Sequence, residues 1–141
     1  MPEPSQFRIW LAEDNPGDVR LFREALKNRA LPFDLTVADD GQKAISLVQS
    51  AAQDQAIDLP HLIVLDVNLP RHNGDEVLRQ IRSEATLDGV PVIVLTSSAS
   101  PVDQATANKL GANLYIQKPS DLEGLMTIGA LVEHLLKNRQ H

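Results

Sequence analysis

Carboxylate, hydroxyl and ammonium groups stand at the ends of four apolar segments of this sequence. Glu13 and Asp14 follow the run IWLA, and Asp66 closes the run LIVLD. Thr96 closes VPVIVLT, and Lys118 directly follows NLYIQ. If these runs are parallel strands of one sheet, their carboxyl ends lie at one edge, where open α/β proteins place their ligand sites. The spacing therefore predicts one site that holds three carboxylates, a hydroxyl and an ammonium.

The residue types of this predicted site indicate phosphoryl chemistry. Clustered carboxylates raise one another's pKa, and a hard divalent cation such as Mg²⁺ (or Mn²⁺) relieves the conflict because it prefers oxygen ligands. We therefore expect a metal ion among Glu13, Asp14 and Asp66. The ammonium of Lys118 and the hydroxyl of Thr96 can both donate to a phosphoryl oxygen. An aspartate carboxylate is a nucleophile for this chemistry, so Asp66 is the candidate acceptor.

Each of these residues also has an ordinary structural interpretation. Asp66 can cap a turn, and Glu13 with Asp14 can form a solvated loop. Thr96 can be a β-branched strand end, because TSSAS is also typical of turns. Lys118 can be a surface lysine. Their joint occurrence at consistent strand ends favours the functional interpretation.

Short β-like runs alternate with amphipathic segments along the whole chain. The runs 62–65 and 92–95 have no polar alternation, which is typical of parallel strands covered by helices on both faces. Five strand–helix units are too few for an eight-stranded barrel. We therefore predict an α/β fold with a doubly wound, five-stranded parallel sheet and five helices. The strands are expected at 7–12, 34–38, 62–66, 90–96 and 113–117, and the helices at 18–30, 41–53, 74–85, 101–110 and 122–137.

The bulk composition excludes several classes of protein. Nineteen acidic and 13 basic residues give a net charge of −6, which argues against nucleic acid and against an anionic membrane surface as partners. The chain has no cysteine, no apolar run long enough to span a bilayer and no signal peptide in MPEPSQ, so we expect a cytoplasmic protein. Within 141 residues we expect an N-terminal tail at 1–6, one domain at 7–137, a C-terminal tail at 138–141 and no output domain.

With these motifs in this order, the sequence resembles a response-regulator receiver domain of bacterial two-component signalling. The resemblance rests on Glu13–Asp14, Asp66, Thr96 and Lys118–Pro119, and it covers about residues 7–137. It implies a flavodoxin-like receiver fold with strand order 2-1-3-4-5. It also implies a single-domain response regulator, a phosphoprotein whose surface changes when a sensor histidine kinase phosphorylates it.

The resemblance implies a role for each residue at the acceptor site. Asp66 would take the phosphoryl group from a phosphohistidine of the kinase. Asp14 would bind Mg²⁺ directly, Glu13 mainly through water, and Asn68 through its backbone carbonyl. Lys118 would pair with a phosphoryl oxygen. The protein would be a phosphoacceptor that assists its own phosphotransfer and autodephosphorylation, without being an enzyme that acts on another substrate.

The resemblance also implies a conformational switch near the acceptor. Thr96 would contact the phosphoryl group and move with it, and Tyr115 would change orientation together with Thr96. Packing of an aromatic residue in a strand is the simpler interpretation of Tyr115. The Lys118–Pro119 peptide bond stands where receivers commonly have a cis bond. Asn68 and Ser98 flank the site, and we expect them to set how quickly water removes the phosphoryl group.

The segment EDNPGDVRL supplies both a helix start and a narrower resemblance. Asn15 is placed to cap a helix, and Pro16 is suited to the first helical position. Asp18 then falls in the first turn, near the positive end of the helix dipole, so we assign it to the helix rather than to the metal site. The same segment resembles receivers paired with bacterial phytochromes, which makes a phytochrome a candidate kinase.

The last helix has an unusually wide apolar surface. Its apolar positions cover more than half of the circumference, which is more than a single core contact requires. A few tolerated exposed leucines are the simpler explanation. Our hypothesis is a homodimer through this helix and the fifth strand. The positions are Leu122, Leu125, Met126, Ile128, Gly129, Leu131, Val132, Leu135 and Leu136.

Two other functions remain open from the sequence. The first is a Mg²⁺-dependent phosphohydrolase with an aspartyl nucleophile, which needs a second acid near the nucleophile. The residue two positions after Asp66 is Asn68, which is a poor proton donor, and no substrate-covering cap is evident. The second is a degenerate receiver that acts only through binding. The complete set of strand-end residues argues against it.

Overall fold

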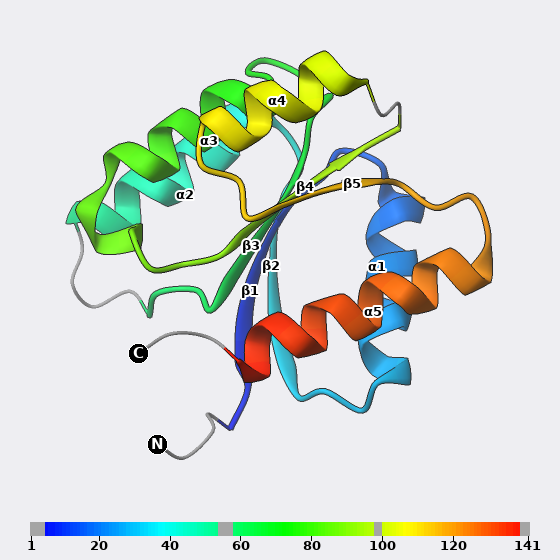
Figure 1. The fold of residues 1–141 in the computed structure, drawn as a ribbon. Helices are drawn as coiled ribbons and strands as arrows, with labels where there is room; N and C mark the ends of the chain where they lie inside the picture. The colour runs from blue at the N-terminus through cyan, green and yellow to red at the C-terminus, as the bar shows by residue number, and fades with distance from the viewer. Residues whose placement is uncertain (1–4, 54–57, 98–99, 139–141) are drawn as a thin grey trace.

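A single parallel sheet organises the chain. The computed structural model describes residues 5–53, 58–97 and 100–138 (Figure 1). The sheet has the order β2-β1-β3-β4-β5, which confirms the predicted fold. The strands are β1 (Phe7–Ala12), β2 (Phe33–Ala38), β3 (Leu62–Asp66), β4 (Val92–Thr96) and β5 (Leu114–Gln117). The helices are α1 (Pro16–Asn28), α2 (Gly41–Gln53), α3 (Gly74–Ser83), α4 (Pro101–Lys109) and α5 (Leu122–Lys137), with a 3₁₀ turn at Ala85–Leu87.

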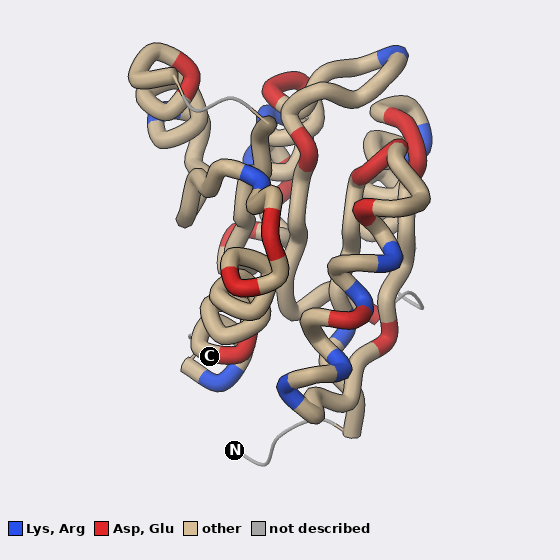
Figure 2. The backbone as a smooth tube through the Cα atoms, turned by 90° about the vertical axis from the view of Figure 1, so that its right-hand side faces the viewer, with Lys and Arg blue, Asp and Glu red and all other residues tan. Residues whose placement is uncertain are grey.

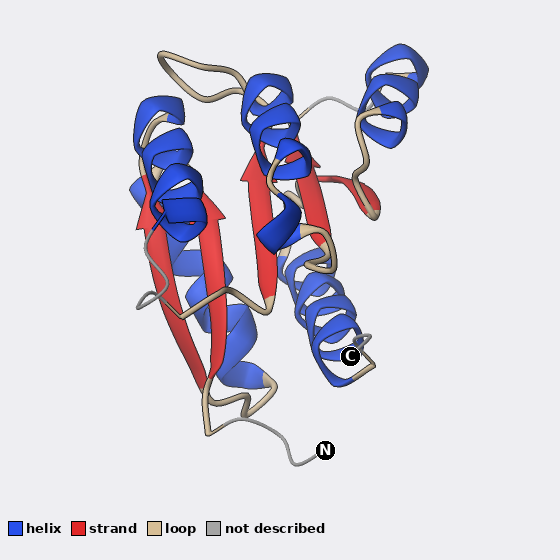
Figure 3. Cartoon of the chain, turned by 90° about the vertical axis from the view of Figure 1, so that its left-hand side faces the viewer, coloured by secondary structure: helices blue, strands red, loops and turns tan. Residues whose placement is uncertain are grey.

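Helices cover both faces of the sheet. Helices α1 and α5 lie on one face, and α2, α3 and α4 lie on the other (Figures 1 and 3). Alternate residues of β1 enter the two cores: Ile9 and Leu11 pack with α1 and α5, whereas Trp10 and Ala12 pack with α2 and α3. Strands β3 and β4 are buried along their whole length, as their continuous apolar runs predict. Burial of each large side chain stabilises the fold by about 1.5–3 kcal/mol.

The element boundaries differ from the predicted ones where caps and turns decide them. Helix α1 begins at Pro16, as the predicted cap at Asn15 implies, rather than at residue 18 of the expected range, because the Asn15 side chain accepts hydrogen bonds from the first-turn backbone. Helix α3 ends at Ser83, because Glu84 is extended. Strand β4 begins two residues later than predicted, since Val90 N–H bonds to Leu87 O in a turn. The predicted limits of β3, α2 and α5 are confirmed.

Two glycines permit close packing around the loop that follows β3. A Cβ at Gly74, the first residue of α3, would lie 2.8 Å from the carbonyl oxygen of Asp66. A Cβ at Gly41, the first residue of α2, would clash with the carbonyl oxygen of His72. The starts of both helices therefore press against this loop, and they fix the backbone that carries Asp66. Asn73 caps α3 by accepting a hydrogen bond from the backbone N–H of Glu76.

The wide apolar surface of α5 is largely covered within the chain. Its buried residues contact the sheet and the neighbouring α1 (Figure 1). Met126, Leu131 and Leu135 are half-buried, while Leu122 is 69% exposed at the start of the helix. Two intramolecular neighbours thus account for most of the apolar circumference. The fully buried positions are Leu125, Ile128, Gly129, Val132 and Leu136.

The surface of the chain carries charges of both signs. In the view of Figure 2, acidic and basic positions are interspersed along the helices and loops rather than separated into two faces. Within the described part of the chain, every helix is too short or too polar to cross a bilayer.

Candidate functional site

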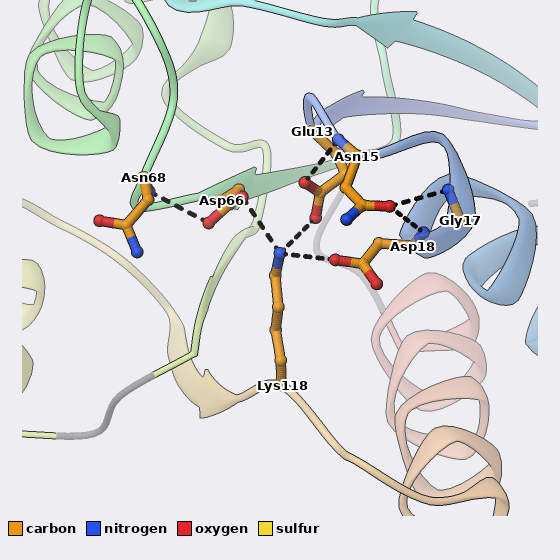
Figure 4. A network of polar contacts seen from close by, with 7 residues as sticks. All are labelled: Glu13, Asn15, Gly17, Asp18, Asp66, Asn68 and Lys118. Carbon is orange, nitrogen blue, oxygen red and sulfur yellow. Dashed lines mark hydrogen bonds and ion pairs between the residues drawn. The ribbon is translucent and has the colours of Figure 1, made fainter.

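The ammonium of Lys118 joins three carboxylates at the carboxyl edge of the sheet (Figure 4). Its Nζ lies 2.6 Å from Oε1 of Glu13, 3.0 Å from Oδ2 of Asp18 and 3.1 Å from Oδ2 of Asp66. Glu13 follows β1, Asp66 ends β3, Lys118 follows β5, and Asp18 lies in the first turn of α1. The fold thus brings together side chains that are up to 105 residues apart in the sequence.

Burial strengthens the electrostatic interactions among these charged groups. The side chains of Glu13 and Asp66 are only 3% and 5% exposed, and that of Lys118 is 19% exposed. Burial raises the pKa of Glu13 to about 7, the hydrogen bond from Lys118 opposes that rise, and the neighbouring Asp66 adds to it. Burial alone would lower the pKa of Lys118, but its three carboxylate partners raise it above the ordinary value. Lys118 is therefore a firmly protonated cation.

Three carboxylates also form a cluster with the dimensions of a metal site. One oxygen from each of Glu13, Asp14 and Asp66 lies within 4.8 Å of the others. Asp14 is exposed, so the cluster opens to solvent on its side. The donors are hard oxygens, and their negative charge exceeds what one ammonium can balance. This donor set fits Mg²⁺ or Mn²⁺, which bind carboxylates and retain water ligands.

The second oxygen of Asp66 is held by the loop that follows it. Its Oδ1 accepts a hydrogen bond from the backbone N–H of Asn68 at 3.1 Å, while Oδ2 accepts from Lys118 (Figure 4). The carboxylate is thus oriented on both sides. These two hydrogen bonds fix the position of the carboxylate that is the candidate nucleophile.

The start of α1 is built as predicted, but one of its residues does more than predicted. Asn15 Oδ1 accepts from the backbone N–H groups of Gly17 and Asp18, at 2.8 and 3.1 Å. Asn15 N–H in turn donates to Oε2 of Glu13 at 3.2 Å. Asp18 occupies the first turn, as predicted, and it also pairs with Lys118, which sequence reasoning missed. The cap at Asn15 places Asp18 in the first turn, but only the packing of α1 against the sheet decides which side chain Asp18 meets.

Comparison with known proteins identifies the family of this chain. The family described as "Response regulator receiver domain" matches residues 9–129. This chain is a receiver domain of that family.

Relatives of this receiver domain include one of similar length and longer proteins. The response regulator Rcp1 of Synechocystis is 36% identical over 117 residues, which cover 83% of this chain and 80% of Rcp1. The response regulator MprA of Mycolicibacterium vanbaalenii is 39% identical over 122 residues, 84% of this chain. This chain spans only 47% of the length of MprA.

Solved structures agree with the fold. The phosphorylated cyanobacterial phytochrome response regulator RcpA superposes with a TM-score of 0.83 at 35% identity, covering 94% of this chain and 95% of RcpA. The Mn²⁺-bound form of Rcp1 has a TM-score of 0.82 at 32% identity, with 95% and 97% covered. A response regulator in red light signalling of R. palustris has a TM-score of 0.82 at 25% identity, with 96% of each chain covered.

Thr96 and Tyr115 of the receiver domain lie on adjacent strands. Thr96 ends β4, is 2% exposed, and accepts a backbone hydrogen bond from Lys118 N–H at 2.6 Å. Tyr115 pairs with Val94 in the β4–β5 register, and its ring packs against the core under α2, α3 and α4. Its hydroxyl is buried, and among the described residues it has no hydrogen-bond partner. Their coupled movement remains a prediction.

The structure contradicts one expected feature of the receiver site and does not describe another. The predicted cis bond between Lys118 and Pro119 is wrong for this structure, because the described residues contain no cis peptide. The trans form is the intrinsically favoured one, and Lys118 reaches all three carboxylates with it. Ser98, expected to tune dephosphorylation, lies outside the described residues.

Proposed function

We propose that this receiver domain accepts a phosphoryl group on Asp66 from a phosphohistidine of a sensor histidine kinase, in a Mg²⁺- or Mn²⁺-dependent reaction. One observation carries the proposal. The Asp66 carboxylate lies 3.1 Å from the Lys118 ammonium and belongs to a three-carboxylate cluster within 4.8 Å. The nucleophilic carboxylate, the Lys118 ammonium and a candidate site for a divalent metal ion therefore lie together.

The transfer follows from these groups. An oxygen of Asp66 forms a bond to phosphorus as the phosphorus–nitrogen bond of phosphohistidine breaks, and the bonding pair stays on the imidazole nitrogen. Lys118 then donates to a phosphoryl oxygen. Asp14, Glu13 and the Asn68 carbonyl would hold the divalent cation, whose charge offsets that of the phosphoryl oxygens.

The proposed output is a change of surface. Thr96 ends the strand beside β3, so its hydroxyl can bond a phosphoryl group on Asp66 and move with it. Tyr115 would reorient with it and give its buried hydroxyl a partner. Asn68, two residues after the acceptor and exposed, would set the access of water to the aspartyl phosphate together with Ser98.

A phytochrome is the proposed class of kinase. Support comes from the similarity to RcpA, which is described as a cyanobacterial phytochrome response regulator, over 94% of this chain. Phosphotransfer from a purified bacterial phytochrome kinase should be faster than transfer from a histidine kinase of another sensor class. Equal or slower transfer from the phytochrome would contradict this assignment.

A homodimer through α5 and β5 remains a proposal. Strand β5 lies at the edge of the described sheet, and Leu122 at the start of α5 is 69% exposed. An unpaired edge strand beside an exposed leucine is a suitable surface for a second copy. Light scattering at micromolar concentration should give a dimeric mass, and a monomeric mass with and without phosphorylation would contradict the proposal.

Labelling with a small phosphodonor tests the acceptor role directly. The parent protein with Mg²⁺ and acetyl phosphate should gain a modification that is stable in acid and labile in base. Asp66→Asn should abolish it, whereas Asp34→Asn, at an exposed acid on β2, should leave it unchanged. No labelling of the parent, or persistence of the label in Asp66→Asn, would overturn the proposed function.

A further inference from the structure

Asp18 is a third carboxylate partner of the Lys118 ammonium. A lysine ammonium has three N–H donors, and Lys118 directs them to Glu13, Asp18 and Asp66 at 2.6, 3.0 and 3.1 Å. Figure 4 shows Asp18 reaching the ammonium from the first turn of α1, whereas Glu13 and Asp66 extend from strand ends. The three partners therefore belong to three separate elements.

The three carboxylate partners of Lys118 have different roles in the proposed reaction. Glu13 and Asp66 belong to the carboxylate cluster suited to a divalent cation, and Asp66 is also the acceptor. In the proposed reaction Asp66 gives up its contact with Lys118 to the phosphoryl group, and Glu13 would share its carboxylate between Lys118 and the divalent cation. Asp18 lies outside that cluster and has no such competing role.

We propose that Asp18 is a positioning residue that tethers the Lys118 ammonium over Asp66 throughout phosphoryl transfer. The proposal rests on the proposed function of Asp66. During the transfer, the Lys118 N–H that donates to Asp66 Oδ2 donates instead to a phosphoryl oxygen. This contact is the longest of the three. The bond to Asp18 persists and keeps the ammonium from swinging away.

The surroundings of Lys118 explain why a tether matters. Lys118 borders a pocket of about 40 Å³ between α1 and α5, which Glu13 and Asp18 also line and whose other lining side chains are apolar, among them Leu11, Phe22 and Ile128. An ammonium that moves away from these two carboxylates, among the apolar side chains, loses its hydration and its partners. Without Asp18, the remaining alternative for a displaced ammonium is solvent, where it no longer serves the phosphoryl group.

The geometry of α1 holds Asp18 where a tether is needed. Its backbone N–H is capped by Asn15, and α1 is fixed to the sheet through the buried Phe22 and Leu26. The side chain is 39% exposed, so the carboxylate lies at the solvent rim of the site and closes one side of it.

The chain offers a matched control for the effect of a first-turn aspartate on its helix. Helix α4 starts with Ser100, Pro101 and then Asp103, and the Ser100 side chain accepts from Asp103 N–H at 3.0 Å. Asp103 thus repeats the position of Asp18 behind a capping residue and a proline. It is exposed, and no ion pair to it is found among the described residues.

A double-mutant cycle separates tethering from helix stabilisation. The parent must first be labelled on Asp66; if it is not, the proposed function fails before Asp18 is tested. At saturating acetyl phosphate and Mg²⁺, Asp18→Asn should lower the labelling rate constant about five-fold. This is the change in rate that corresponds to the loss of a partly exposed ion pair. Asp18→Glu should restore most of the rate, and Asp103→Asn should leave it unchanged.

The Lys118→Gln background decides whether Asp18 acts through Lys118. There, Asp18→Asn should change the residual rate by less than two-fold, because the partner is gone. An equal loss in both backgrounds would overturn the proposal, as would an unchanged rate in the parent background.

Exchange of the Lys118 ammonium hydrogens with water provides a second readout. Followed by NMR in Mg²⁺ without phosphodonor, exchange should accelerate in Asp18→Asn but not in Asp103→Asn. Unchanged exchange in Asp18→Asn would contradict the tether, whatever the labelling rates show.

Discussion

Lys118 and Glu13 form a close ion pair, 2.6 Å from Nζ to Oε1, with a carboxylate that is 3% exposed. Even with this partner, burial and the nearby Asp66 raise the pKa of Glu13 to about 7. One buried ammonium is therefore insufficient for the carboxylates gathered around it. This donor set therefore fits a divalent cation.

The raised pKa of Glu13 predicts a pH dependence of the metal-free protein. A carboxyl whose folded pKa is raised above its unfolded value, from 4.5 to about 7, stabilises the fold below about pH 4.5. That contribution is lost as the pH rises from about 4.5 through 7. In EDTA, the parent should lose unfolding free energy over this window relative to Glu13→Gln. Urea unfolding at pH 5 and 8 measures it, and parallel curves for the two proteins would contradict it.

Metal binding should reverse the loss at neutral pH. A ligand that binds only the folded state adds about 2.7 kcal/mol at 100 times its dissociation constant. Mg²⁺ should therefore raise the melting temperature of the parent at pH 7.5. Asp14→Asn should abolish the rise with little effect on the metal-free protein, because Asp14 is exposed. The control Asp34→Asn, on β2, should retain it, and a Mg²⁺ shift that survives in Asp14→Asn would exclude Asp14 as a ligand.

The buried hydroxyl of Tyr115 is expected to cost stability before phosphorylation. An unpaired buried hydroxyl is unfavourable, so Tyr115→Phe should stabilise the unphosphorylated protein by about 1 kcal/mol. That corresponds to a rise in melting temperature of roughly 3 °C for a domain of this size. Calorimetry provides the measurement. A lower melting temperature would mean that the hydroxyl is hydrogen-bonded in the unphosphorylated state.

The close approach of α3 to the acceptor predicts a strong effect at Gly74. A Cβ there would lie 2.8 Å from Asp66 O and 2.9 Å from Val67 Cα, and the backbone must shift to admit it. Gly74→Ala should destabilise the protein by about 2 kcal/mol and slow the labelling of Asp66. Gly89→Ala is the matched control, since its Cβ would meet nothing within 4 Å. Comparable effects of the two substitutions would refute this account.

The fold and most of the site could be predicted because their signals are local. Continuous apolar runs identify β3 and β4 as buried parallel strands, and parallel strands end at a common edge. Glu13 follows β1, Asp66 ends β3 and Lys118 follows β5, so these residues must then converge, whatever the details of packing. The cap at Asn15 is equally local, because side chain and backbone lie within three residues.

The sequence by itself thus determined the layer architecture, the strand order implied by its family resemblance, and which edge carries the chemistry. Only the tertiary structure decided that Asp18 turns toward Lys118, that the Lys118–Pro119 bond is trans, and that α1 and the sheet cover most of α5. The physical reason is that these features depend on the rotation and depth of one packed element against another. Periodicity defines which face of a helix is apolar, but the contacts between elements determine what each of its polar side chains meets.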